Sequence, residues 1–531
     1  MANSPATTAP PLSAAAIALN RFGLGARADE APPANAKNWL LAQFDAYQPM
    51  PAAWAAQPTS LAIAAELADE RRQAMANPAT NATNATNATN ATNATNATNA
   101  TNATNATNAT ASGANAASAP NLASNAADAR KAARQAANNA QRMETRDTYR
   151  AAVNARVVSA LTTPAPFVER LVHFWSNHFA VSIDKGRVAP FAGAFEAEAI
   201  RPHVLGRFED MLVAVERHPA MQLFLDQTRS VGPDSVAAMR AAQRNPNRKP
   251  GLNENLAREI MELHTLGVRS GYTQEDVTEF ARAMTGWSIA DAQGPQPNNP
   301  GTANTAPPGA FMFRPQLHEP GTRTIMGRRY DQPGEGQTLA VLHDLSSAPA
   351  TATHIATRLA RHFVADNPPP DVVDQLATAF MRSRGDLPTV YRALIDSDAA
   401  WSPVAVKFKS PWEWTISSMR GLGMHNLNDG ERLVQMAPVL TQLGQQVWRP
   451  GSPAGYDDIA ASWAAPDALV RRVEIAQRFA ARVGDRLDAR ALGQTLTAGS
   501  LSEPTQLAVS RAESASTALA LLLVSPDFQR R

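Results

Sequence analysis

Two short segments of this chain concentrate side chains that could carry chemistry. One is residues 171–179 (LVHFWSNHF) and the other is residues 253–287. The candidate catalytic side chains in these segments are His173, Asn177, His178, Glu259, Glu262 and His264. Imidazole and carboxylate groups that project inward from several helices are how helical proteins build acid–base and metal sites. If the elements that carry them converge, these residues predict a catalytic site.

In the second segment, helical spacing separates a polar face from an apolar face. Glu259 and Glu262 lie on the polar face, where Arg258 is spaced to form an ion-pair ladder with Glu254 and Glu262. Two carboxylates three residues apart could face a metal or a substrate, although a solvated polar face has the same pattern. His264 falls on the apolar face. It is either a site residue or, as is commoner for this pattern, a hydrogen-bonded core histidine.

In the first segment, His173 and His178 lie five residues apart, about 140° around a helix. A regular helix therefore cannot direct both rings at one ion, and they converge only if the helix ends near Asn177. The alternative is one core histidine, His178, and one surface histidine, His173. Arg170, Asn177 and His178 could also line a pocket. A further histidine, His362, falls on an apolar stripe of its own predicted helix.

A long excursion rich in Pro and Gly, Asp291–Tyr330, carries an adjacent histidine and carboxylate, His318 and Glu319. Within it, residues 311–313 and 324–326 are predicted to pair as a short β-hairpin. Long loops in compact helical domains are often functional. If the chain uses a cofactor, we expect a divalent metal, with ligands drawn from His178, Glu259, Glu262, His318 and Glu319.

Helical patterns dominate the remaining elements, with apolar residues recurring at spacings of three and four. Thr273 followed by Asp276, and Ser410 followed by Pro411 and Glu413, predict capped helix starts. Residues 443–456 read as a loop rich in Pro and Gly. The predicted fold is therefore mainly α, one large multi-helical domain with long loops.

Ten tandem copies of Asn-Ala-Thr interrupt the helical pattern at residues 81–110. Such a tract cannot bury enough apolar surface to offset its ordering entropy. We therefore expect four parts in sequence order: a disordered terminus at 1–12, helical core at 13–76, a disordered low-complexity insert at 77–127, and the main helical domain at 128–528. The helices that flank the insert are expected at Leu61–Ala76 and Asp128–Leu161.

Composition excludes several classes of function. The formal net charge of the 531 residues is only +2, which gives no support to nucleic-acid binding. The absence of cysteine excludes disulfides, thiolate catalysis and cysteine-ligated metals. No apolar run is long enough to span a bilayer. The N-terminal residues lack the basic region and apolar core of a signal peptide, so the sequence as it stands predicts a cytoplasmic protein, or a periplasmic or secreted one if the true start lies upstream.

The chain resembles a bacterial family known as domain of unknown function 1800. Six blocks carry this resemblance in order: Asn20–Gly25, His173–Phe179, Asn253–Trp287, Lys407–Gly421, Leu443–Gln445 and Trp463–Arg472. The resemblance implies a largely helical fold, frequent export, and genes beside those of a sulfatase-like family. This chain departs from the family at His318-Glu319, where the family usually shows His-Asp, and at Thr322–Gly327, which replaces a lysine-containing segment.

Two hypotheses of function follow. The first is an accessory or binding component of an envelope or secreted system that acts with the sulfatase-like companion. It is supported by the gene pairing and by the lack of a nucleophile elbow, a phosphate-binding loop and a His-Glu-x-x-His motif in the sequence. The second is a helical enzyme, hydrolase-like and metal-assisted if it takes a metal, built on the His, Glu and Asn cluster.

Overall fold

The computed structural model describes residues 10–76, 122–245, 251–291, 306–427 and 435–531. Over these ranges the chain is mainly helical, and its β-structure consists of two small antiparallel sheets of two strands each. The predicted fold class, a mainly α single large domain, is confirmed. Most of the predicted terminal segment 1–12 and of the predicted insert 77–127 lies outside the described residues.

The helices of the first half are α1 (Ala14–Ala16), α2 (Ala36–Ala46), α3 (Ala52–Ala55), α4 (Ser60–Ala76), α6 (Leu122–Thr162), α7 (Pro166–His178), α8 (Ala192–Phe195), α9 (Phe208–Arg217), α10 (Pro219–Phe224), α11 (Val236–Arg244), α12 (Asn255–Glu259) and α13 (Gln274–Met284). Those of the second half are α14 (Glu335–Ser346), α15 (Pro349–Phe363), α16 (Pro370–Ser383), α17 (Leu387–Asp396), α18 (Pro411–Gly421), α19 (Met436–Gln442), α20 (Pro466–Val483), α21 (Ala489–Leu496), α22 (Glu503–Ser510), α23 (Ala515–Val524) and α24 (Pro526–Gln529). In the described part of the chain, three segments form π-helix: Ile17–Phe22, Glu196–Ile200 and Ile260–His264.

Two predicted helix starts are present as capping boxes. At α13 the Thr273 side chain accepts from the Asp276 backbone N–H, and the Asp276 carboxylate accepts from the Thr273 N–H. Ser410 and Glu413 make the same reciprocal pair at α18, with Pro411 in the first turn. Each box satisfies two backbone donors that a helix start would otherwise leave unpaired.

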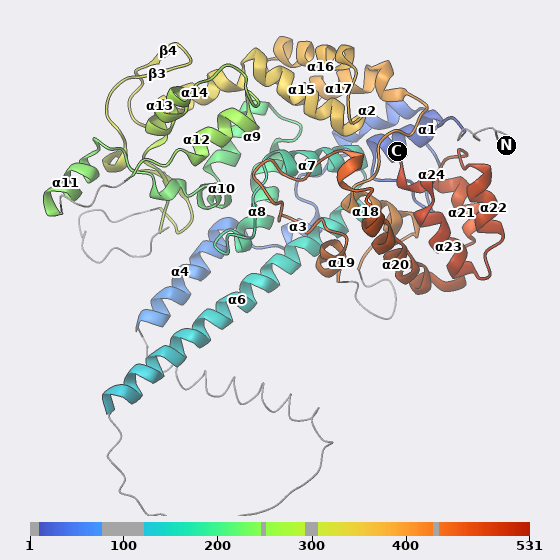
Figure 1. Cartoon of the computed structure of the whole chain (residues 1–531), viewed down its shortest axis with the longest axis horizontal. Coiled ribbons are helices and arrows are strands. Elements are labelled where there is room, and N and C mark those ends of the chain that lie inside the picture. The colour runs from blue at the N-terminus through green and yellow to red at the C-terminus, as the bar shows by residue number, and fades with distance from the viewer. Residues whose placement is uncertain (1–9, 77–121, 246–250, 292–305, 428–434) are drawn as a thin grey trace, which may run out of the picture.

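Helices α4 and α6 extend together away from the body of the molecule (Figure 1). Glu66 of α4 lies beside Glu144 of α6, and this neighbouring carboxyl group raises the pKa of Glu66. Both helices were predicted, and α6 begins at Leu122 rather than at Asp128. The C-terminal part of α6 enters the core, where Val157 and Leu161 are fully buried.

The segment 253–287 forms α12, the π-helical turn Ile260–His264, and α13. Arg258 forms the predicted ion pair with Glu254 at 3.2 Å. Its other hydrogen bond goes to Gln274 at the start of α13, which ties the two helices together. Of the predicted ladder, the pair with Glu254 is therefore present, and the second interaction of Arg258 is a contact between helices.

The predicted hairpin is wrong in its pairing. Residues 311–313 form β2 (Phe311–Phe313), but β2 pairs with β1 (Trp287–Ile289), directly after α13. Strand β3 (Arg323–Ile325) pairs with β4 (Arg328–Tyr330). Met326 and Gly327 between them both have positive φ, the geometry of a tight two-residue hairpin turn, so β3 pairs locally. The Trp287 and Phe311 rings pack edge to face at 5.0 Å and hold the other pair together.

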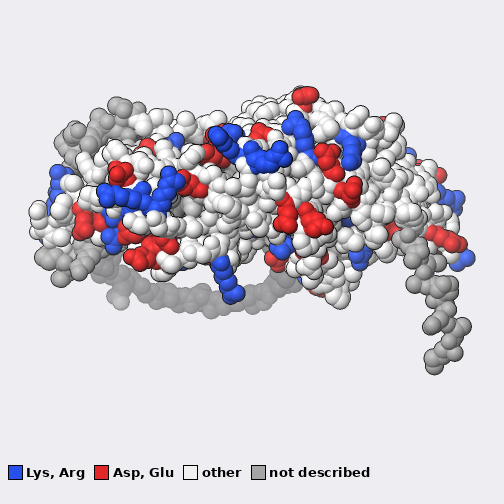
Figure 2. All heavy atoms as spheres, turned by 90° about the horizontal axis from the view of Figure 1, so that it is seen from above, with Lys and Arg blue, Asp and Glu red and all other residues white. Residues whose placement is uncertain are grey.

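Helix α7 lies in the middle of the fold, and all its residues except Asn177 are buried (Figure 1). Helices α15, α16 and α17 pack on each other along one side, and α20 packs with α23 in the C-terminal group. An isolated bridge between Phe408 and Arg530 ties the chain's last residues to the segment before α18. None of the described helices is long and apolar enough to cross a membrane. On the face drawn in Figure 2, positive and negative side chains are interspersed.

Candidate functional site

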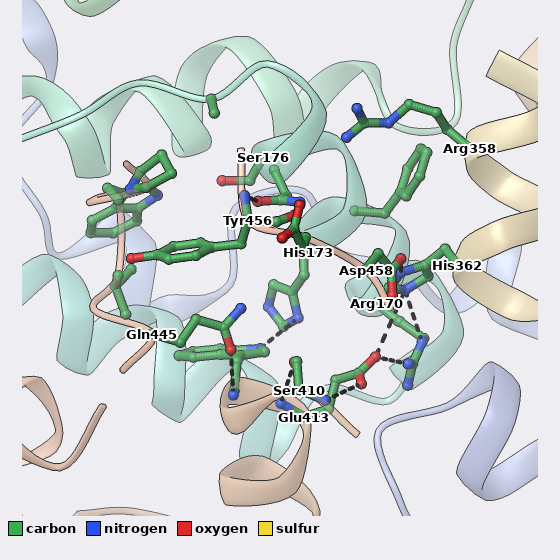
Figure 3. Close-up of a pocket in the computed structure, with 18 of the residues that line it drawn as sticks. Arg170, His173, Ser176, Arg358, His362, Ser410, Glu413, Gln445, Tyr456 and Asp458 are labelled. Carbon is green, nitrogen blue, oxygen red and sulfur yellow. Dashed lines mark hydrogen bonds and ion pairs between the residues drawn. The ribbon is translucent and has the colours of Figure 1, made fainter. Parts of the chain in front are cut away.

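A cavity of about 210 Å³ opens where α7, α15, α18 and the loop 443–458 meet (Figure 3). Its polar side chains include Arg170, His173, Arg358, His362, Glu413 and Asp458. Its aromatic lining residues include Phe174, Trp412, Trp448 and Tyr456. Helix α7 supplies one wall because Arg170, His173 and Asn177 fall on one face at helical spacing. Two candidates from the sequence, His173 and Asn177, therefore lie at this cavity, as does Arg170.

The His173 ring is fixed in one tautomer. Its Nδ1 accepts a hydrogen bond from the Trp412 indole N–H at 3.1 Å, so its proton sits on Nε2. That nitrogen lies 3.7 Å from the Glu169 carboxylate, beyond hydrogen-bond reach. Burial, reinforced by Arg156 and Arg201, holds the pKa of His173 well below its usual range, so the ring is neutral. The prediction that His173 is a surface histidine is wrong, because the ring is 8% exposed.

Asn177 positions the loop that closes the cavity. Its side-chain amide donates to the Tyr456 carbonyl at 2.8 Å, and its carbonyl oxygen accepts from the Tyr456 N–H at 2.7 Å. Gly455 allows this approach, since it has φ +82° and an added Cβ would lie 2.2 Å from the Asn177 backbone oxygen. Asn177 therefore acts on the cavity by holding its wall in place.

A network of buried charges forms the base of the cavity. The Glu413 carboxylate pairs with the guanidinium groups of Arg170 and Arg531, the latter at 2.7 Å, and accepts from the Ser410 N–H at 2.8 Å. Arg170 also donates to the Gly23 carbonyl at 2.8 Å. Burial alone would raise the pKa of Glu413, but the two arginines hold it well below its usual range. The carboxylate is therefore charged at neutral pH and shared between two cations.

His362 connects this network to the loop. Its Nδ1 donates to the Asp458 carboxylate at 2.5 Å, and its Nε2 accepts from the Arg170 Nε–H at 3.2 Å. Asp458 also contacts the Lys407 ammonium at 3.3 Å. Burial would raise the pKa of Asp458, but His362 and Lys407 lower it overall. The arrangement orients a neutral imidazole between a carboxylate and an arginine at the cavity wall, which is a geometry suited to proton transfer.

Two other candidates, His178 and His264, lie in the protein core rather than at the cavity. The His178 Nε2 contacts the His264 carbonyl at 3.1 Å, and His354 reaches the adjacent Leu263 carbonyl at 3.1 Å. These imidazoles satisfy carbonyls that the end of the π-helical turn leaves unpaired. The His264 ring pairs with the buried Glu216 at 2.8 Å. Both residues therefore have the role of hydrogen-bonded core histidines.

The remaining candidates are spread over other parts of the fold. Glu259 and Glu262 are partly buried beside Tyr272, and burial raises the pKa of Glu259. His318 contacts the Thr285 carbonyl at 2.9 Å, which docks the long loop onto the end of α13. Glu319 is buried and accepts a hydrogen bond from the N–H of Asp234, just before α11, at 2.7 Å. Within the described ranges, no three His, Asp or Glu side chains are grouped so that they could hold a metal ion.

Several cavity residues carried no distinct signal in the sequence. Glu413 reads as a capping residue, and it does cap α18 with one oxygen while its other oxygen joins the ion network. His362 reads as part of an apolar stripe. Arg358 and Asp458 stand out by neither type nor spacing. Their roles depend on contacts between segments far apart in the sequence, such as the 96 positions between His362 and Asp458, which no local pattern encodes.

Comparison with known proteins identifies the family. The family model described as protein of unknown function (DUF1800) matches residues 17–530, nearly the whole chain. The chain therefore belongs to this family, as its sequence blocks predicted. No curated protein and no solved structure matches the chain significantly.

Proposed function

We propose that this DUF1800 family member is a small-molecule-binding protein and that its ligand occupies the cavity between α7, α15, α18 and the loop 443–458. The observation that carries the proposal is the cavity's construction: charged and polar side chains from several elements converge with aromatic rings around one concave space. Binding sites for small molecules are concave, mostly pre-formed, and combine an apolar lining with a few fixed polar groups. This cavity has each of those properties.

The walls are pre-organised by the folded chain. His173 is held by Trp412, the loop is held by Asn177, and Glu413 is held by two arginines. Folding already orders these side chains, so ligand binding does not incur the entropy cost of ordering them. The volume of about 210 Å³ lies below the roughly 300–1,000 Å³ typical of drug-sized ligand sites, which favours a small ligand.

Blocking the cavity provides the test. Ala454 lines it from the loop, so Ala454→Trp fills its mouth without altering the ion network. Ala464→Trp, at an exposed position outside the lining, is the matched control. Thermal shift and calorimetry against a library of sugars, amino acids, nucleosides and their charged derivatives should find ligands for the wild type and for Ala464→Trp that Ala454→Trp does not bind. Ligands that bind all three proteins equally would place binding elsewhere and refute the proposal.

Such a protein suits the role of an accessory component in an envelope or secreted system, acting with a sulfatase-like companion. The support is the gene pairing that the family resemblance implies. Co-expression and affinity purification with that companion test the role. Absence of a complex, together with unchanged activity of the companion, would count against this partner while leaving ligand binding in place.

A hydrolase-like enzyme is the second candidate, favoured by one observation, the His362–Asp458 pair at the cavity wall. A carboxylate that fixes the tautomer of an imidazole is a frequent arrangement in acid–base catalysis. Assays with nitrophenyl esters, phosphates and sulfates should then show activity that His362→Gln lacks. The metal-assisted version predicts a bound divalent ion, and elemental analysis showing well under one metal per chain after reconstitution would retire it.

A further inference from the structure

The charges around the cavity are unevenly paired. Each carboxylate of the buried network has a cationic partner: Glu413 pairs with Arg170 and Arg531, and Asp458 pairs with Lys407 while it accepts from the neutral His362 ring. Among the cations, Arg156 pairs with Glu196 at 2.8 Å behind the cavity. Once these pairs are assigned, the charges that remain on the lining of α15 are positive.

The unpaired charges are those of Arg358 and Arg361. Arg358 makes no hydrogen bond or ion pair with any residue in the described part of the chain, although it is only partly exposed. Figure 3 shows its side chain extending from α15 over the cavity. The Arg361 Nε donates to the Asp366 carbonyl at 3.2 Å, which leaves the terminal nitrogens of its guanidinium group without an anionic partner.

The two arginines share one face of α15 because they lie three residues apart. Burial lowers the pKa of Arg358, Asp458 partly opposes this, and Arg361 lowers it further. A cation in this position is costly unless an anion compensates it. Guanidinium groups are also the side chains best suited to bind carboxylate, phosphate and sulfate oxygens through paired hydrogen bonds.

We infer that the cavity's ligand carries one anionic head group, a carboxylate, phosphate or sulfate, and that Arg358 and Arg361 bind it. This inference rests on the proposed function, because it names the ligand class for the same cavity. The rest of the ligand lies against the aromatic rings of the lining, which include Phe174 and Trp448. The ligand is therefore a small organic anion with an apolar or ring-shaped body.

The test uses probes that share a ring and differ in charge: glucose, glucose 6-phosphate, glucose 6-sulfate and glucuronate, together with inorganic phosphate, sulfate and acetate. Affinities are measured by calorimetry for the wild type, Arg358→Gln and Arg361→Gln. Arg382→Gln, an exposed position on α16, is the control. We expect anionic probes to bind the wild type and the control, and to lose about tenfold or more in affinity in Arg358→Gln, the size expected when a charge-assisted hydrogen bond is lost.

Melting temperatures show whether Arg358→Gln is folded. They also distinguish the ligand-binding role of Arg358 from the structural role of Arg170. Arg358→Gln removes an unpaired cation, so its melting temperature without ligand should equal or exceed that of the wild type. Arg170→Gln breaks the pairing of Glu413 and should lower it. Millimolar phosphate or sulfate should raise the melting temperature of the wild type more than that of Arg358→Gln.

Each outcome separates the inference from the proposed function. If glucose binds as tightly as its charged derivatives, or if Arg358→Gln binds anions normally, the anionic head group is refuted while the cavity remains a binding site. If none of the anions binds the wild type, the inference also fails, and Ala454→Trp with the neutral members of the library then decides the proposed function. The relative affinities of the phosphate, sulfate and carboxylate probes identify the head group.

Discussion

At the scale of single residues, this protein uses histidines and charges that share a similar sequence context for opposite purposes. His178 and His264 are hydrogen-bonded inside the core, whereas His173 and His362 are fixed by hydrogen bonds at a cavity. All four are buried or nearly buried, so residue type and burial alone do not separate them. What distinguishes the two pairs is whether the ring borders the cavity, and this depends on which elements pack against it.

Glu413 is the residue on which the buried network depends most. Glu413→Gln should lower the free energy of unfolding by about 3–5 kcal/mol at neutral pH, because it leaves Arg170 and Arg531 without a charged partner. Chemical denaturation measures this loss. The matched control is Glu279→Gln, whose ion pairs with Arg282 and Arg323 are partly exposed and should contribute less than about 1 kcal/mol.

Glu413 also predicts how stability responds to acid. Its pKa is lower in the folded chain than in the unfolded chain, so its contribution is complete above the unfolded value of about 4.3 and is lost as the pH falls through the folded value. Glu413→Gln should lack this part of the acid dependence. Equal costs for Glu413→Gln and Glu279→Gln would show that the network does not stabilise the fold as described.

His354 predicts a second pH effect, of the same sign but at higher pH. Burial lowers its pKa to about 4, below the unfolded value of about 6.5. Between these values the unfolded chain binds more protons, so stability should fall as the pH is lowered from 6.5 to 4 and be constant above 6.5. In His354→Gln, whose amide can still donate to the Leu263 carbonyl, the slope of unfolding free energy against pH should be shallower. Parallel curves for the two proteins over this range would contradict the assignment.

At the scale of elements, a loop determines whether the polar face of a helix lines a cavity. Helix α7 places Arg170, His173 and Asn177 on one face. The loop 443–458 covers that face and forms the cavity, because the N–H and the carbonyl of Tyr456 both hydrogen-bond to the Asn177 side chain. The sequence identifies this segment as a loop because of its Pro and Gly. Its function as a wall depends on Gly455, which lets the loop approach α7 closely.

Gly455→Ala tests that function. The substitution forces an L side chain into a positive φ and against the Asn177 carbonyl, so it should cost about 1–3 kcal/mol of stability and loosen the loop. Faster hydrogen exchange at Tyr456 and weaker ligand binding should accompany the loss. Gly451→Ala, in the same loop with an ordinary φ and no atom within 4 Å of its added Cβ, should be close to neutral. Equal effects of the two substitutions would mean that the Gly455 contact does not hold the loop.

At the scale of the whole molecule, one helical body carries the cavity, and α4 and α6 extend away from it (Figure 1). The cavity draws on α7, α15 and α18 and, through Arg531, on the C-terminal residues. Segments from most of the chain therefore have to be in place before the cavity exists. The Asn-Ala-Thr tract at 81–110 lies between α4 and α6 in sequence and outside the elements that form the cavity.

Deletion of residues 81–110 should leave folding intact, because their composition offers little apolar surface to bury. The melting temperature of the deletion variant should match that of the wild type, and its binding of small anions should be unchanged. Val157→Ala, at a fully buried position of α6, provides a positive control that must lower the melting temperature. A large fall in the deletion variant would show that the tract supports the fold.

The sequence by itself determined the properties that depend on neighbours along the chain. Helical spacing, the capping boxes at Thr273 and Ser410, and the loop between α19 and α20 were all predicted, as was the family. The strand pairing of Phe311–Phe313 was not, because a strand of three residues carries too little pattern to select its partner. The cavity was predicted only in part, through His173, Asn177 and Arg170. Tertiary structure alone decided that Arg170 meets Glu413, 243 residues away, and that Arg358 forms no hydrogen bond or ion pair with the described residues. Charge pairing depends on distances through space, which local sequence patterns do not contain.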